Sequence, residues 1–141
     1  MPDKFVTQRR VEFRDTDAAG IMHFSSFFPM MEEVEHEFWR SLGLDIIAPD
    51  PAGAIVWPRV MARCDYRSPV TFGDVMDIEL RVGRVGGKSV TYDFEFSHQG
   101  RPVATGQVVA VACRMTPGAT PLSVAVPEKV ARAFAAEGKK S

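Results

Sequence analysis

The sequence has little cysteine, little histidine and no excess of either charge. Its 141 residues include two cysteines and three histidines, and 17 Lys and Arg nearly balance 18 Asp and Glu, giving a formal net charge of −1. Nucleic acid is therefore not expected as a partner, because nucleic-acid-binding domains carry clustered positive charge. Cys64 and Cys113 lie in apolar runs without CxxC spacing. This pattern favours buried free thiols and a cytoplasmic protein.

Long hydrophobic runs and metal-ligand spacings are also absent. The longest charge-free run, residues 18–31, contains Gly20 and Pro29 and is shorter than the ~20 residues that span a bilayer. The N-terminus from Met1 to Lys4 leads into an alternating pattern without the hydrophobic region of a signal peptide. No group of His, Cys, Asp and Glu has the spacing of a metal site. The sequence therefore predicts no membrane span, no targeting segment and no bound metal.

Length and periodicity predict one domain over residues 1–141, built from strands, one long helix and a short terminal helix. A chain of about 150 residues buries roughly 68–70% of its unfolded surface, which is enough for a real core. Alternating apolar residues predict strands, and apolar residues at spacings of three and four predict helices. The predicted strands are residues 5–13, 55–67, 74–85, 88–98 and 102–115, and the predicted helices are residues 24–42 and 127–138.

Local signals bound the first strand and the long helix. Val11 and Phe13 are expected on the inward face of the strand. Gly43 is a natural end for the helix. Pro29 requires the regular helix to begin close to Ser25 or Ser26, because proline is tolerated only where its missing N–H is not needed. The two serines are expected to cap that start. Residues 48–53, rich in Pro and Gly, are expected to form a loop.

The later strands are expected to be antiparallel neighbours. Gly86-Gly87 and Gln99-Gly100 separate them at the positions of tight hairpin turns. A single amphipathic helix can cover only one face of the resulting sheet. The other face, or an edge strand, should therefore pair with another subunit.

The segment Asp15-Thr16-Asp17-Ala18-Ala19-Gly20 is the strongest functional signal. It places two carboxylates directly ahead of a helix start, whose free backbone N–H groups can hold a negative charge. A carboxylate beside an anion hole suggests acyl chemistry. By themselves, the two aspartates are better explained as loop and N-cap residues, since Asp is favoured before any helix.

The run from Val11 to Phe24, the helix behind it, and the later Tyr66-Arg67-Ser68-Pro69 and Gly73-Asp74 resemble the 4-hydroxybenzoyl-CoA thioesterase family of hotdog-fold acyl-CoA thioesterases. The resemblance covers roughly residues 5–115. It implies an α+β hotdog fold, in which a five-stranded antiparallel sheet wraps around a long central helix, here followed by a short C-terminal helix. It also implies a homodimer with active sites at the subunit interface. In the family, such dimers often pair into homotetramers.

The resemblance further implies a role for each candidate site residue. Asp17 falls on the catalytic aspartate, acting as nucleophile or general base, and the backbone amide of Phe24 falls on the group that polarises the thioester carbonyl. The role of His23 is open: it either orients the substrate or satisfies a local hydrogen bond. The substrate is an acyl-CoA, and the reaction needs no metal or redox cofactor. Arg84, Lys88 and Ser89 match a basic turn that touches the coenzyme A nucleotide.

Several alternatives stay open at this point. Asp15 is interpreted as structural, and Glu35 on the helix is kept as a backup acid, because a related branch of thioesterases uses a helix glutamate. A hotdog-fold hydratase or dehydratase acting on acyl thioesters would need a clear His with Asp or Glu pair, for which His23 is the one candidate. A non-catalytic acyl-CoA-binding module is the third hypothesis. The acyl group itself, whether aromatic, polyketide-like or fatty, is open.

Overall fold

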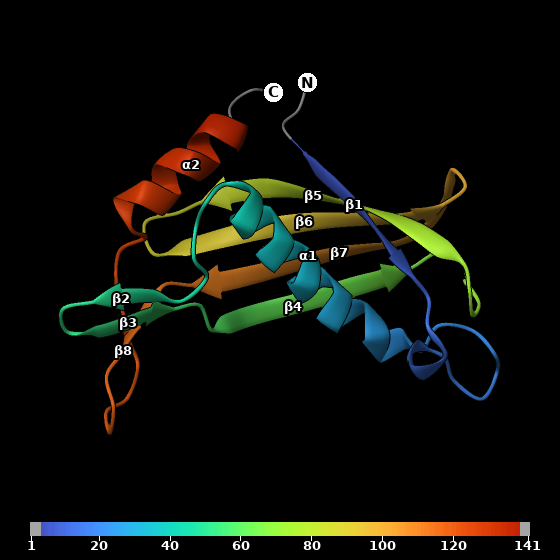
Figure 1. Cartoon of the computed structure of the whole chain (residues 1–141), viewed down its shortest axis with the longest axis horizontal. Coiled ribbons are helices and arrows are strands. Elements are labelled where there is room, and N and C mark those ends of the chain that lie inside the picture. The colour runs from blue at the N-terminus through green and yellow to red at the C-terminus, as the bar shows by residue number, and fades with distance from the viewer. Residues whose placement is uncertain (1–3, 139–141) are drawn as a thin grey trace.

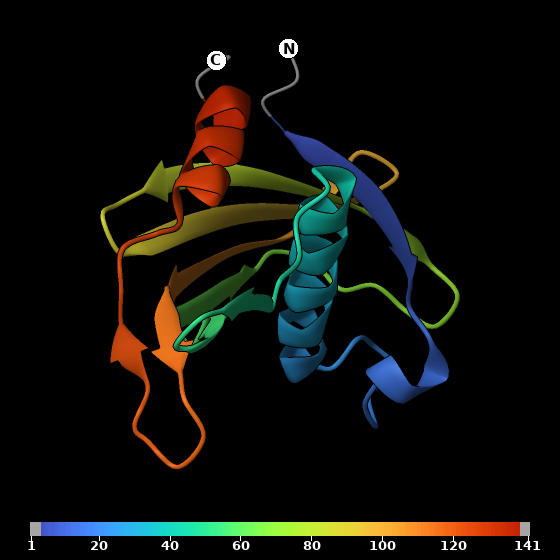
Figure 2. The same ribbon diagram turned by 60° about the vertical axis from the view of Figure 1, so that its left-hand side comes forward.

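The computed structural model describes residues 4–138, within which five antiparallel strands form the main sheet. Its order is β1-β5-β6-β7-β4, so β1 and β4 are the edges. The strands are β1 (Phe5–Arg10), β4 (Arg59–Tyr66), β5 (Val75–Val85), β6 (Ser89–His98) and β7 (Arg101–Val111). The sheet wraps around the long helix α1 (Phe27–Ser41), and the short helix α2 (Glu128–Gly138) lies at one end (Figures 1 and 2). The expected α+β hotdog arrangement is confirmed.

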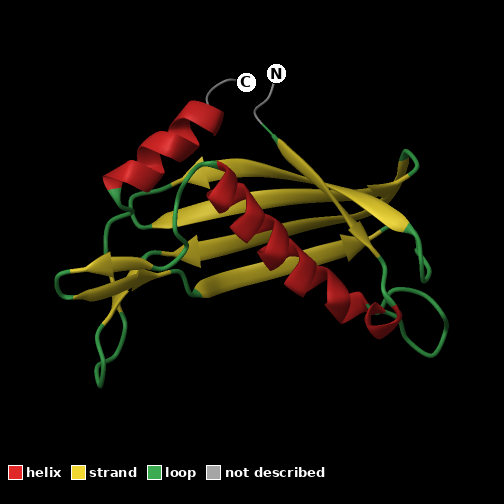
Figure 3. Ribbon diagram, viewed as in Figure 1, coloured by secondary structure: helices red, strands yellow, loops and turns green. Residues whose placement is uncertain are grey.

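A small second sheet corrects one loop prediction and two strand predictions. Residues 48–53 are not a loop: β2 (Ala48–Asp50) pairs with β3 (Gly53–Val56), and the sheet continues through β8 (Cys113–Met115) to β9 (Leu122–Ser123), at one end of the molecule (Figure 3). The expected strands 55–67 and 102–115 are each divided in two. Pro58 separates β3 from β4 because it has no N–H for the ladder. Ala112 separates β7 from β8: its N–H still donates to the Lys88 carbonyl at 2.9 Å, whereas its carbonyl accepts the Val124 N–H at 2.9 Å, beside the small sheet.

The first strand is shorter than predicted. It ends at Arg10, and residues Phe13–Asp15 form a 3₁₀ turn instead. The Asp15 carboxylate accepts the Glu12 N–H at 2.8 Å, and the Asp15 N–H donates to the Glu12 carbonyl at 2.9 Å. This turn leaves Phe13 78% exposed while Val11 is fully buried, so the prediction of an inward Phe13 is wrong. It also gives Asp15 the structural role expected of it.

The long helix begins where Pro29 requires it to begin. A 3₁₀ turn over Phe24–Ser26 leads into α1, so Pro29 lies in the first helical turn, where its missing N–H has no acceptor to lose. The apolar stripe faces the sheet, and its buried side chains are Phe27, Met30, Met31, Val34, Phe38 and Trp39. At the far end, the fully buried Phe134 of α2 contacts the rings of Phe38, Trp39 and Tyr92.

The structure does not describe the two ends of the chain. Residues 1–3, part of the N-terminus predicted to lack a signal peptide, lie outside the described residues, as do residues 139–141 at the end of the expected domain. No helix within residues 4–138 is long and apolar enough to cross a bilayer.

A charged network lies inside the fold, on the flank of α1 that faces β4. Glu35 is only 1% exposed, and its carboxylate is paired with the Arg59 guanidinium, which also contacts Glu32 at 3.2 Å. Tyr92 accepts the Trp39 indole N–H at 3.0 Å and is hydrogen-bonded to Glu35. Burial raises the pKa of Glu35, and the Arg59 charge opposes that rise. The helix is thereby joined to both β4 and β6 through a buried carboxylate.

We predict that Arg59→Met destabilises the protein more at neutral than at acid pH. Removing one partner of a buried ion pair costs about 3–5 kcal/mol, because the remaining charge is uncompensated. Without Arg59, the pKa of Glu35 in the folded state lies still further above its unfolded value. The folded state then binds more protons than the unfolded state, so stability falls as pH rises through that range. Denaturant unfolding at pH 5 and pH 8 measures the difference.

Two variants control this measurement. Arg132→Met removes the same charge from an exposed pair with Glu128 on α2, and should cost less than about 0.5 kcal/mol. Glu35→Gln combined with Arg59→Met removes the buried charge and should abolish the pH dependence. Equal destabilisation by Arg59→Met at both pH values contradicts the prediction.

Candidate active site

The segment with the two aspartates forms a closed loop against the end of the main sheet. The loop is closed by a bridge between Thr16 and Met22, and it joins the sheet end because the Met22 N–H donates to the Val70 carbonyl at 2.8 Å. Gly20 has φ +83°, in the left-handed region that L side chains rarely adopt, so glycine is required there. The Asp17 N–H donates to the Ile21 carbonyl at 2.9 Å, which fixes the aspartate inside the loop.

The Asp17 side chain lines a cavity of about 440 Å³. One of its carboxylate oxygens, Oδ1, accepts the Ala19 N–H at 2.9 Å, and within the described residues the other has no protein donor. The other lining residues are mostly apolar: Ile21, Met22, Phe24, Phe27, Tyr66, Arg67, Ser68, Pro69 and Val70. The loop thus presents a carboxylate with an unoccupied oxygen to an apolar cavity.

Phe24 lines the same cavity. Its N–H is the first of the 3₁₀ turn and has no acceptor in the part of the chain that the structure describes. The turn leads directly into α1, whose N-terminal end has a partial positive charge. A carboxylate and a free amide on one cavity at a helix start form an arrangement suited to a reacting carbonyl.

His23 and the two serines stabilise the turn in a way that differs from the prediction. Neither Ser25 nor Ser26 caps α1 with its side chain; Ser26 Oγ donates to the Asp15 carbonyl at 3.1 Å. Instead, His23 Nδ1 accepts the Ser25 N–H at 3.2 Å and pairs with Ser25 Oγ at 2.8 Å. The His23 ring stacks on Phe24 with centroids 4.6 Å apart. These contacts are those of a capping residue, and His23 is not among the residues that line the Asp17 cavity.

Arg84, Lys88 and Ser89 lie at the opposite end of the sheet from Asp17. The Asp17 loop packs beside the start of β5, whereas Lys88 and Ser89 follow the end of β5 (Figure 1). An 11-residue strand at ~3.3 Å per residue spans on the order of 35 Å. One chain therefore does not bring these residues to Asp17.

Glu35 also lies away from the Asp17 cavity. With Arg59 it lines a separate cavity of about 260 Å³, whose apolar walls include Phe28, Met31 and Phe94. Because its carboxylate is already paired with a guanidinium, it is engaged in the structure rather than free to act as a base.

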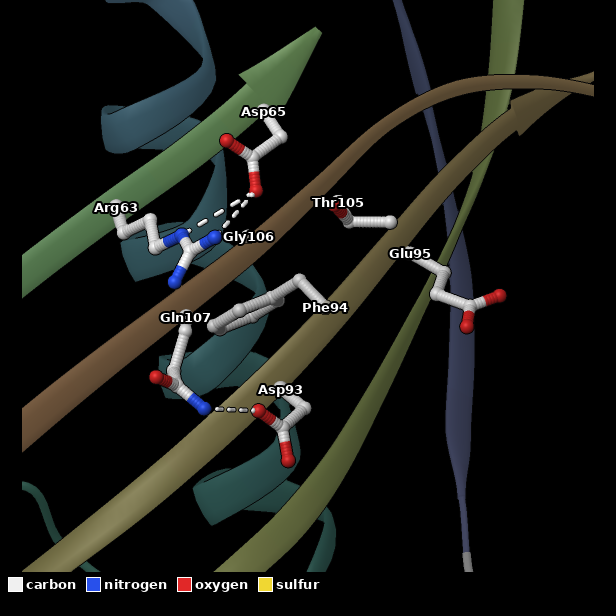
Figure 4. A pocket seen from close by; sticks show the side chains of 8 residues that line it. All are labelled: Arg63, Asp65, Asp93, Phe94, Glu95, Thr105, Gly106 and Gln107. Atoms are coloured by element: carbon white, nitrogen blue, oxygen red, sulfur yellow. Dashed lines mark hydrogen bonds and ion pairs between the residues drawn. The ribbon is translucent and has the colours of Figure 1, made fainter. Parts of the chain in front are cut away.

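A third hollow lies on the sheet face away from α1 (Figure 4). Its polar side chains largely pair with one another: Arg63 contacts Asp65 at 3.1 Å, and Gln107 Nε2 donates to Asp93 at 2.7 Å. This face is a solvated polar surface. No cluster of three or more His, Cys, Asp or Glu side chains that could hold a metal ion occurs anywhere in residues 4–138.

Sequence reasoning did not single out Tyr66, which lines the cavity. Tyr66 entered only as part of the resemblance, yet its hydroxyl donates to the Phe24 carbonyl at 2.8 Å. The available signal in the sequence was a polar aromatic residue at the end of a predicted strand, just ahead of Ser68-Pro69. Its partner could not be found from the sequence, because the two residues are 42 positions apart.

Comparisons with known proteins agree with this geometry. The family model of the Thioesterase-like superfamily matches residues 11–134. A 1,4-dihydroxy-2-naphthoyl-CoA hydrolase from Synechococcus elongatus is 33% identical over 103 residues, which cover 72% of this chain and 76% of the relative.

Solved structures show the same fold. A gentisyl-coenzyme A thioesterase is 30% identical with a TM-score of 0.78, over 92% of this chain and 99% of that one. A 4-hydroxybenzoyl-CoA thioesterase has a TM-score of 0.82 over 94% of this chain and 99% of that one; at 19% identity it shows the fold alone. With a matching family model over most of its length and relatives of this identity, the chain belongs to the thioesterase-like superfamily of hotdog-fold proteins.

Proposed function

We propose that this protein hydrolyses an acyl-CoA thioester to the free acid and coenzyme A. The observation that carries the proposal is the pairing, on one apolar cavity, of the Asp17 carboxylate with the free N–H of Phe24. The names of two similar proteins, a 1,4-dihydroxy-2-naphthoyl-CoA hydrolase and a gentisyl-coenzyme A thioesterase, support the same reaction.

The chemistry follows from these two groups. Asp17 either attacks the carbonyl carbon, giving an anhydride that water then hydrolyses, or takes a proton from the water that attacks. In both routes the carbon–sulfur bond breaks and coenzyme A leaves as a thiolate that takes up a proton. Negative charge develops on the carbonyl oxygen, and the Phe24 N–H stabilises it; one such donor is typically worth about 10²–10³ in rate.

An aromatic acyl group suits this cavity. The side chains of Phe24, Phe27 and Tyr66 supply ring faces and edges, against which a flat ring packs favourably. Similar proteins are named for 1,4-dihydroxy-2-naphthoyl-CoA and gentisyl-CoA, both of which are aromatic thioesters. The hydratase alternative is weaker, because His23 is engaged in capping and lies off the cavity.

A second copy of the chain would complete the site. The edge strand β4 has one neighbour, β7, and a bare outer edge in the described residues. Two-fold antiparallel pairing of β4 with the β4 of another copy would bring the partner's turn with Arg84, Lys88 and Ser89 to the Asp17 end. There the basic groups could bind the nucleotide phosphates of coenzyme A. We therefore propose a homodimer, of the kind that pairs further into homotetramers in the family that the sequence resembles.

The proposed location is the cytoplasm. Cys64 and Cys113 are both free thiols, and they lie on different strands, β4 and β8. Free thiols persist in a reducing compartment. Coenzyme A thioesters are the proposed substrates there, and no cofactor is proposed beyond the coenzyme A of the substrate itself.

We predict that Asp17→Asn lowers kcat for thiol release by about 10²–10⁴, because the amide neither attacks nor takes a proton. Release of coenzyme A from a panel of aromatic and aliphatic acyl-CoAs measures this with a thiol reagent. Asp45→Asn, an exposed aspartate after α1, serves as the matched control and should behave as wild type. Unchanged release by Asp17→Asn would remove Asp17 from the chemistry. No release by wild type from any substrate would favour the binding module, and hydration of an enoyl-CoA would favour the hydratase.

A subunit-mixing experiment tests the shared site. Lys88→Ala should raise KM for an acyl-CoA several-fold and leave KM unchanged for the matching acyl-pantetheine, which has no nucleotide. Mixed dimers of Asp17→Asn and Lys88→Ala chains should regain one site with wild-type kcat and KM, because both substitutions fall in the other site. Two results contradict the shared site. One is a mixture whose activity is only the sum of the activities of the two parent enzymes, and the other is a mass in solution equal to that of one chain.

A further inference from the structure

The Phe24 turn is joined to the main sheet by one side chain. The hydroxyl of Tyr66, at the end of β4, donates to the Phe24 carbonyl at 2.8 Å. The other polar contacts of residues 24–26 run to His23 and Asp15 of the loop and, at the start of α1, from the Phe27 N–H to the Ser25 carbonyl. Within residues 4–138, the Tyr66 hydroxyl is therefore the turn's only hydrogen bond to the main sheet.

We propose that Tyr66 is a positioning residue, which holds the Phe24 turn so that the Phe24 N–H stays directed at the thioester oxygen. This inference rests on the proposed function. The peptide units on both sides of the Phe24 Cα are held: the His23 carbonyl accepts the Ser26 N–H at 2.9 Å, and the Phe24 carbonyl accepts the Tyr66 hydroxyl. The Phe24 N–H shares a planar peptide unit with the His23 carbonyl, so the Ser26 bond sets its direction within the turn. The Tyr66 bond holds the adjacent peptide unit and thereby places the turn against the main sheet.

The fold gives Tyr66 a rigid base for this task. Its backbone pairs with Ala104 of β7 in the main sheet. Its ring packs edge-on against Phe27, with centroids 5.3 Å apart, and Phe27 packs in turn against Phe96 of β6 at 5.1 Å. Phe27 is the first residue of α1 and is 4% exposed. The hydroxyl is therefore held in place by the packed core through Phe27, although the side chains of Tyr66 and Phe24 are 48% and 63% exposed.

Tyr66 remains a donor throughout the working range of pH. Burial, with added effects from the neighbouring Cys64 and Asp65, raises the pKa of Tyr66 to about 12. A neutral hydroxyl that donates to a carbonyl adds no ionisation to the reaction. A positioning role therefore changes the rate without changing the shape of the pH profile.

The size of the effect follows from the donor that Tyr66 positions. Loss of one oxyanion donor typically costs about 10²–10³ in kcat, and small displacements of reacting groups are also costly. Tyr66→Phe keeps the ring packing and the amide, and removes the hydroxyl alone. We expect kcat to fall about 10-fold, which is less than the loss of the whole donor would cost, because the amide is still present. KM should change less than about threefold.

The test compares Tyr66→Phe with Tyr92→Phe, the same substitution at the other tyrosine of the chain. Tyr92 is buried between Trp39 and Glu35, away from the Asp17 cavity, so its loss should lower Tm and leave kcat unchanged at a temperature well below unfolding. Tyr66→Phe should lower kcat with little change in Tm and no change in the shape of the pH profile. In the Asp17→Asn background, it should also shift the infrared carbonyl band of a bound acyl-CoA toward that of the free thioester.

The outcomes separate this inference from the proposed function. Wild-type release of coenzyme A with kcat retained in Tyr66→Phe would overturn the inference alone. So would a rise in KM at constant kcat, which would make the hydroxyl a substrate-binding group, or an unchanged carbonyl band. A loss of kcat that appears only near the unfolding temperature would show a merely structural role. Wild type without thiol release would overturn the proposed function and the inference with it.

Discussion

The packing of α1 within the wrapped sheet is the constraint on which the rest of the structure depends. One helix fills the space enclosed by five strands, and its apolar stripe is matched by the inward residues of β5, β6 and β7. Because the first helical residue, Phe27, is buried against Phe96, the start of α1 is fixed at one end of the sheet. The loop that carries Asp17 has to meet the sheet at that same end.

That placement explains why the site contains unsatisfied groups. A helix start always leaves backbone donors without intrahelical partners. Here His23 satisfies the Ser25 N–H and Ser26 donates to the His23 carbonyl, while the Phe24 N–H has no acceptor within residues 4–138. An oxygen of Asp17 is left free on the same cavity. The free groups are rigidly supported by their neighbours, which is the arrangement that electrostatic stabilisation of a transition state requires.

The charged network around Glu35 serves a different purpose from the site. It joins α1 to β4 and β6 inside the core, where a carboxylate is stable only with its guanidinium partner. Two apolar side chains in place of Glu35 and Arg59 could stabilise the core equally well. Such a pair would not specify which turn of α1 faces β4. The helix glutamate that the sequence offered as a backup acid is thus explained by helix register.

The sequence by itself determined the elements and the chemistry they could carry. Period-two and period-3.6 patterns located the main strands and α1, and Pro29 located the start of the helix, because these signals are local. The order Asp15, Asp17, Gly20 and Phe24 marked the site before any contact was known. Local patterns gave the wrong prediction at Phe13 and at residues 48–53, where capping by Asp15 and the pairing of β2 with β3 outweigh local propensity. Only the tertiary structure decided the long-range relations: that Tyr66 meets Phe24, that Glu35 is paired with Arg59, and that Lys88 lies a strand's length from Asp17. These relations depend on which strand ends meet in space, and no local pattern encodes that.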